Sequence, residues 1–214
     1  MPLLHSHIRF AVDIRESLHV ENLAPYISGT MYPDSGYISG LDKDITHPAD
    51  FLERSFFHES DFGKGCFAHV LYDRLFDRVA RKSFPELFST QWNGQRKGSE
   101  LWAGRTALKI LQDIEDAKAI QRENYLPHLE YAENPNQEKL DEVREYNSIL
   151  QKVFAEKGDP YEKYYRMWTL FRVEEYKVAM IREFVEKFRK DPRTLQTIGE
   201  IYGHTRLKWE KSRN

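Results

Sequence analysis

Apolar residues spaced three and four positions apart are the feature that most constrains the fold of this chain. Between residues 6 and 18, for example, Ala11, Ile14 and Leu18 recur at these spacings and predict an amphipathic helix with His7 near its start. Period-2 alternation of β-branched residues, which is typical of strands, hardly occurs. We therefore expect an all-α chain.

The same spacing predicts further helices at residues 60–82, 100–125, 137–156, 161–190 and, for a short one, 194–202. Either Ser60 or Asp61 can cap the first of these. Residues 22–48 are interrupted by Pro and Gly so often that they predict a long loop. We find no linker or repeat, and expect one multi-helix bundle spanning residues 1–214, with a site in residues 5–82 and additional helices over 100–204.

Composition excludes several classes of protein. The single Cys66 rules out an intramolecular disulfide framework and a cysteine-rich zinc ribbon. With 32 Lys and Arg against 34 Asp and Glu, the net charge of −2 argues against stable nucleic-acid binding. The first residues lack the pattern of a secretory signal, and no segment approaches the roughly 20 apolar residues of a membrane span. We expect a cytoplasmic protein, and the sequence leaves its oligomeric state open.

His69 and Asp73 form the first candidate for chemistry. Lying one turn apart on the helix predicted at 60–82, they point about 40° apart on a face with apolar neighbours. A buried carboxylate needs a cation or several donors, and a divalent metal is one such partner. A pair with this spacing is more often a simple hydrogen bond or ion pair, so the motif alone does not establish a metal site.

Three further residues strengthen the metal interpretation: His7 on the first helix, and Asp34 and His47 in the segment predicted as a loop. Three imidazoles and two carboxylates suit zinc best, and iron, manganese or nickel also accept such ligands. The order helix, loop, helix allows the five groups to converge.

Four short motifs resemble the zinc-dependent phospholipase C and S1/P1 nuclease superfamily, especially its bacterial phospholipase C-like members. The motifs are Ser6-His7-Ile8-Arg9-Phe10-Ala11, Gly29-Thr30-Met31-Tyr32-Pro33-Asp34, Asp44-Ile45-Thr46-His47 and Gly65-Cys66-Phe67-Ala68-His69-Val70-Leu71-Tyr72-Asp73. Their order and approximate spacing are similar to those of the family, and they cover about a third of the chain, within residues 6–73.

The resemblance implies an all-α fold and an enzyme that uses up to three zinc ions to hydrolyse phosphodiester bonds in phospholipids or nucleic acids. It implies that His7, His47, His69 and Asp73 bind metal, and that Asp34 either binds metal or acts as a general base. The family's later His and its His-x-x-x-Glu helix have no counterpart here, because His128 and His204 lack that frame. We therefore expect one metal, or two at most.

Several neighbours compete for a place at the site. His5 lies two residues before His7, so the two side chains point about 160° apart on a helix and only one can face the metal. We assign His5, Tyr72 and Asp77 as possible supporting residues around the ligands. Glu115 and Asp116 offer carboxylates, but the default expectation places them on a solvated helix face.

Two functional hypotheses follow. The first is a metal-dependent hydrolase of a small phosphoester or lipid-like substrate that uses a metal-activated water. The second is a non-catalytic helical domain in which the same residues hold a structural metal or a buried polar network and the surface binds a partner. A phosphohydrolase of the HD type ranks below both, because its adjacent His-Asp pair is absent from the chain.

Overall fold

Helices account for all the regular secondary structure of the residues described by the computed structural model, which are 3–88, 95–121 and 124–212. The all-α prediction is therefore confirmed for these ranges. None of the helices in them is both long enough and apolar enough to cross a membrane.

The helices differ widely in length. They are α1 (Leu4–Ile14), α2 (Leu23–Met31), α3 (Gly36–Ser39), α4 (Lys43–Thr46), α5 (Phe56–Glu59), α6 (Asp61–Ser83), α7 (Gln95–Asp116), α8 (Leu140–Ala155), α9 (Pro160–Leu170), α10 (Glu175–Phe188) and α11 (Pro192–Ser212). Short 3₁₀ helices lie at Arg15–Leu18, Tyr32–Ser35, Pro85–Phe88 and Leu126–Glu130.

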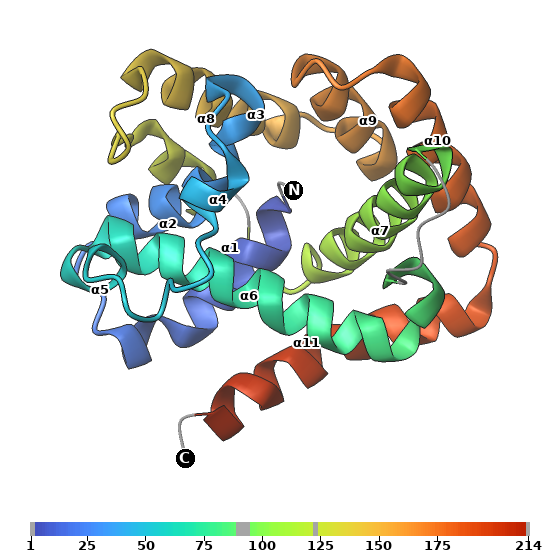
Figure 1. Ribbon diagram of the computed structural model, residues 1–214, viewed down its shortest axis with the longest axis horizontal. Coiled ribbons are helices and arrows are strands. Elements are labelled where there is room, and N and C mark those ends of the chain that lie inside the picture. The colour runs from blue at the N-terminus through green and yellow to red at the C-terminus, as the bar shows by residue number, and fades with distance from the viewer. Residues whose placement is uncertain (1–2, 89–94, 122–123, 213–214) are drawn as a thin grey trace.

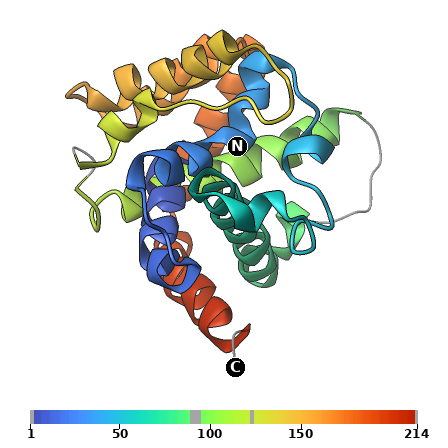
Figure 2. The ribbon, with the colours of Figure 1, turned by 90° about the vertical axis from the view of Figure 1, so that its left-hand side faces the viewer.

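Helix α6 is the central element and packs against α1, α2, α5 and α11 (Figure 1). Ser60 begins it as one of the two predicted caps, because its side chain accepts a hydrogen bond from the Gly63 amide at 3.0 Å. Figure 2 shows α8 and α9 at one end of the molecule and α11 running to the C-terminus at the other. One apolar core joins the elements from α1 to α11.

The close approach of α2 and α6 depends on two glycines. A Cβ atom on Gly29 would lie 2.1 Å from the backbone oxygen of Phe62, and one on Gly65 would lie 2.1 Å from that of Tyr26. No side chain fits at either position. The two backbones therefore touch, which brings the carbonyl of Thr30 on α2 to the side chain of His69 on α6.

The prediction of a long loop over residues 22–48 is wrong. Helix α2, a 3₁₀ turn and the short helices α3 and α4 occupy most of it. Pro25 lies in the first turn of α2, where an amide hydrogen has no helical partner to lose. Gly29 allows a close helix crossing rather than ending the helix. Proline and glycine usually break helices, but in α2 Pro25 lies in the first turn and Gly29 at the contact with α6.

Other predicted boundaries also differ from the structure. The helix predicted at 161–190 is two helices, separated near Arg172, whose backbone takes a positive φ of 57°. The helix predicted at 100–125 runs from Gln95 to Asp116, and residues 122–123 of the prediction lie outside the described part of the chain. The final helix continues to Ser212, ten residues beyond its predicted end at 202. Helix ends depend on local caps and packing that periodicity does not report.

Candidate metal centre

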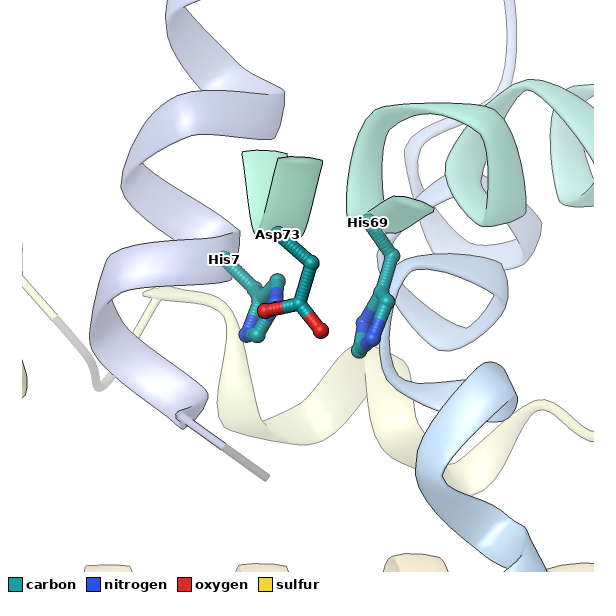
Figure 3. Close-up of side chains that lie close together, drawn as sticks. All are labelled: His7, His69 and Asp73. Carbon is teal, nitrogen blue, oxygen red and sulfur yellow. The ribbon is translucent and has the colours of Figure 1, made fainter. Parts of the chain in front are cut away.

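The structure brings together all five residues predicted as metal ligands. Figure 3 shows His7 of α1 facing His69 and Asp73 of α6, with the three side chains directed toward one another. Asp34 comes from the 3₁₀ turn after α2, and His47 directly follows α4. The ligand atoms form two overlapping sets, each within 4.8 Å: His7, His69 and Asp73, and Asp34, His47 and His69.

Each imidazole is held through its Nδ1 atom. His7 Nδ1 donates to the carbonyl of Leu3 at 2.8 Å, and His69 Nδ1 donates to the carbonyl of Thr30 at 2.7 Å. His47 Nδ1 lies 2.9 Å from the hydroxyl of Thr46. Because a carbonyl only accepts, His7 and His69 carry a proton on Nδ1 when neutral and present a bare Nε2 to the centre. Such anchoring is typical of metal-binding histidines.

The inward atoms lie at separations that metal ligands can have. His47 Nε2 lies 3.1 Å from His69 Nε2 and 3.8 Å from Asp73 Oδ2. His7 Nε2 lies 3.6 Å from Asp73 Oδ1, too far for a good hydrogen bond, and has no other partner among the described residues. Two nitrogen ligands 2.0–2.1 Å from a tetrahedral zinc lie about 3.3 Å apart. The centre thus has a surplus of acceptors at distances that a cation would satisfy.

Asp34 completes the opposite side of the cluster. Its Oδ2 lies 3.7 Å from His69 Nε2, and its Oδ1 lies 3.9 Å from His47 Nε2. Only 4% of the residue is exposed to solvent. A carboxylate so deeply buried requires compensation by positive charge or by donors.

Burial sets the protonation states of this cluster. Loss of solvent lowers the pKa of His47 to about 4, and lowers that of His69 well below the ordinary value, with the neighbouring His7 adding to the shift. Burial raises the pKa of Asp34, but His69 and His47, which become cationic only in acid, hold it below the usual range. At neutral pH the two imidazoles are neutral and the carboxylate is ionised, which are the forms that bind metal.

Lys109 of α7 is the residue of this site that the sequence analysis missed. Its Nζ lies 2.8 Å from Asp73 Oδ1 and 3.8 Å from Asp77 Oδ1. Burial opposes its charge, but Asp73 and Asp77 raise the pKa of Lys109 above that of an ordinary lysine. A lysine inside the apolar run Ala107-Leu108-Lys109-Ile110-Leu111 is the sequence signal that could have found it.

A cavity of about 210 Å³ opens beside the cluster. Asp34 and His47 line it, so two of the candidate ligands face it. Tyr37 and Leu41 contribute much of its apolar wall, and Lys43 contributes a cation. The cluster therefore borders a space in which a small molecule can meet a carboxylate, an imidazole and an ammonium group.

Of the residues predicted to support the ligands, two lie at the cluster and one points away from it. Tyr72 packs edge-on against His7, with ring centroids 5.0 Å apart, and Asp77 reaches the cluster through Lys109. His5 points away from the centre, as the predicted angle between it and His7 requires, and bonds to Asp113.

The expectation for Asp116 is wrong, because this residue is fully buried rather than on a solvated face. It accepts hydrogen bonds from Ser6, Arg9 and Gln112, and belongs to neither candidate ligand set of the described residues. Its partners come from α1 and α7, whose pairing the sequence pattern does not report.

Comparison with known proteins finds no match to this chain among family models, curated proteins or solved structures.

Proposed function

We propose that this protein is a metal-dependent hydrolase of a small phosphoester or related ester. The observation that carries the proposal is the position of Asp34 and His47, which belong to the ligand cluster and also line the adjacent cavity. A catalytic metal keeps a position open to water or substrate, whereas a structural metal is closed by protein ligands. The motif resemblance to the phospholipase C and S1/P1 nuclease superfamily supports the same reaction.

The residues present fit a divalent metal. His7 Nε2 is a buried nitrogen without a hydrogen-bond partner in the described structure, and it belongs to a set of imidazole and carboxylate atoms within 4.8 Å. Three imidazoles with two carboxylates favour zinc, and the same donors accept iron, manganese or nickel. His7, His47, His69 and Asp73 would hold the ion, with Asp34 as a further ligand.

The chain's own groups have distinct roles in this proposal. A bound divalent metal would supply charge neutralisation and a water of lowered pKa. Asp34, ionised and at the cavity wall, accepts a hydrogen bond from the attacking water and orients it. Lys43, which also lines the cavity, binds a phosphoryl oxygen, and the aromatic wall of Tyr37 excludes bulk water. No side chain needs to act as the nucleophile.

The contact of Lys109 with Asp73 favours one metal rather than two in this proposal. Its ammonium group already lies against Asp73 Oδ1, where it neutralises a carboxylate that a second ion would otherwise use. One metal therefore matches the ligand supply better than two, as the missing His-x-x-x-Glu frame also indicates.

The substrate is small in this proposal. A cavity of about 210 Å³ with one lysine in its wall suits a phosphoester with a compact leaving group. A long polyanion would need a broad basic surface, and the net charge of −2 does not favour one.

Elemental analysis of purified protein tests the metal site. We expect close to one metal per chain in the wild type and a loss of the metal in His69→Ala. The control His58→Ala removes an imidazole outside the cluster and should leave the metal content unchanged. Absence of metal from the wild type, even after incubation with zinc, would contradict the proposal.

Activity separates the hydrolase from a structural metal domain. A panel of phosphomonoesters, phosphodiesters and short-chain phospholipids should show turnover that a chelator abolishes and zinc restores. Lys43→Ala should raise KM without loss of metal, because Lys43 lines the cavity but belongs to neither ligand set. Stoichiometric metal with no turnover on any substrate would favour the non-catalytic alternative.

A further inference from the structure

A second buried polar cluster lies on the side of α1 opposite the metal centre. Asp113 of α7 is its hub and is fully buried. Asp113 Oδ2 lies 2.9 Å from His5 Nδ1, and Asp113 Oδ1 accepts the Ser6 amide at 2.6 Å. The hydroxyl of Tyr164 on α9 donates to the same carboxylate. Three donors thus converge on one acceptor group.

These contacts leave one atom of His5 without a partner. The carboxylate of Asp113 accepts from Nδ1, so the neutral ring carries its proton there and has a bare acceptor at Nε2. Among the described residues, His5 Nε2 has no hydrogen-bond partner, although only 4% of the residue is exposed. A buried unpaired nitrogen costs free energy, and one held in place by a carboxylate indicates a ligand position.

His5 forms part of the wall of a cavity of about 400 Å³ between α1, α7, α8 and α9. Three lysines also line it, namely Lys118, Lys157 and Lys163, together with apolar side chains such as Phe154 and Ile114. None of the described lining residues is a carboxylate. The cavity therefore combines clustered positive charge, an apolar wall and an unsatisfied acceptor.

Two acidic groups lie near the cavity in the sequence. Glu115 pairs with Lys118 at 2.5 Å and so neutralises one of the lining lysines, whereas Asp159 caps the start of α9 by accepting from the amide of Tyr161 at 2.7 Å. Lys163 donates to the backbone oxygen of Glu156. Lys157 makes no ion pair within the described part of the chain, so its charge is available to a ligand.

We propose that this cavity is a binding site for a small phosphomonoester that carries an apolar group. Lys157 would pair with the anionic oxygens, and a protonated phosphate oxygen or a ligand hydroxyl would donate to His5 Nε2. Phe154 and Ile114 would cover the apolar group. The site shares no lining residue with the cavity beside the metal centre, and the proposal does not depend on the hydrolase activity.

Phenyl phosphate binding to chelator-treated protein tests this site, since removal of metal prevents turnover and binding at an ion. Calorimetry should show saturable binding to the wild type, and Lys157→Ala should weaken it about tenfold, the effect of removing one hydrogen bond to a charged group. Phenol should not bind. Two matched lysine controls, Lys152→Ala on α8 and Lys43→Ala at the other cavity, should bind as the wild type does.

A nuclear magnetic resonance measurement identifies the atom involved. In histidine-labelled protein, phenyl phosphate should shift the His5 Nε2 signal, which the His5→Gln spectrum assigns. Two results would overturn the proposal. The first is the absence of saturable binding to the wild type. The second is weaker binding to Lys43→Ala together with unchanged binding to Lys157→Ala. Binding that leaves the His5 nitrogen unshifted would remove His5 from the site and overturn its assigned role.

Discussion

His5 and His7 lie two residues apart on α1 and belong to different clusters. Both clusters contain imidazoles and carboxylates, but donors satisfy the carboxylate in the first, whereas acceptors are in excess in the second. Around His5, one carboxylate accepts from an imidazole, an amide and a hydroxyl, so that donors satisfy it without any ion. Around His7, the imidazoles of His7 and His69 give their Nδ1 protons to backbone carbonyls, and their bare Nε2 atoms face carboxylates. Only the second arrangement calls for a cation.

This difference teaches that counting histidines and aspartates does not identify a metal site. The surroundings of Nε2 decide the matter, because a carbonyl or a carboxylate can equally hold Nδ1, but only around His7 and His69 do imidazole nitrogens and carboxylate oxygens of the described residues gather within 4.8 Å. Substitutions in the two clusters should therefore have different consequences, which the following predictions state in order of decreasing effect.

Asp73→Ala should have the largest effect. It removes a candidate ligand and leaves the ammonium group of Lys109 buried without its partner at 2.8 Å. Breaking a buried ion pair in this way costs about 3–5 kcal/mol, which urea unfolding would measure.

The double variant Asp73→Ala with Lys109→Met is the control, because it removes both charges. It should regain most of the lost stability but none of the metal. A single variant as stable as the wild type would show that Lys109 does not depend on Asp73.

Acid should destabilise the metal-free protein through His47. Its pKa is about 4 in the folded protein against 6.5 for the ordinary value, so the unfolded chain binds more protons between these limits. The stabilising contribution is therefore complete above pH 6.5 and is lost as the pH falls toward 4, by at most about 3 kcal/mol.

Urea unfolding between these pH values would measure the effect. His47→Gln should flatten the pH dependence, whereas His58→Gln, at an exposed position, should not. A wild-type stability that rises on acidification across this range would contradict the predicted sign.

Zinc should stabilise the chelator-treated wild type by mass action, by about 2.7 kcal/mol at a free concentration 100 times the Kd. Thermal unfolding with and without zinc would show the gain. His7→Gln should lose the gain and His5→Gln should keep it, which tests the contrast between the two faces of α1 directly. Equal gains in both variants would place the ion elsewhere.

Asp113→Asn should cost less, about 2 kcal/mol, because an amide cannot accept as a carboxylate does from Ser6, Tyr164 and His5. Urea unfolding would measure this loss, while elemental analysis should show unchanged metal content. Loss of metal from Asp113→Asn would mean that the two clusters are coupled through α1.

Part of this arrangement could be predicted from the sequence. The helical spacing gave the all-α fold, and one turn of helix between His69 and Asp73 placed both on one face. The convergence of His7, Asp34 and His47 agrees with the order of the motifs, although their role as ligands remains a prediction. Local periodicity reports such relations because they lie within one element or between short neighbouring ones.

The remaining features depend on contacts between distant elements. Lys109 lies 36 residues from Asp73, and Asp113 lies 108 residues from His5. No spacing rule connects positions so far apart. The error over residues 22–48 has a different cause, since glycine is typical of loops by residue type, whereas the small size of Gly29 allows α2 to touch α6.

The ion pairs of Lys109 also contribute to the net charge of the site. Without metal, the carboxylates of Asp34, Asp73 and Asp77 outweigh the ammonium group of Lys109, so these four groups carry a formal charge of −2 and disfavour an anion. One divalent ion would bring this charge to zero. Under the proposed function, metal occupancy would then decide whether the cavity accepts an anionic phosphoester.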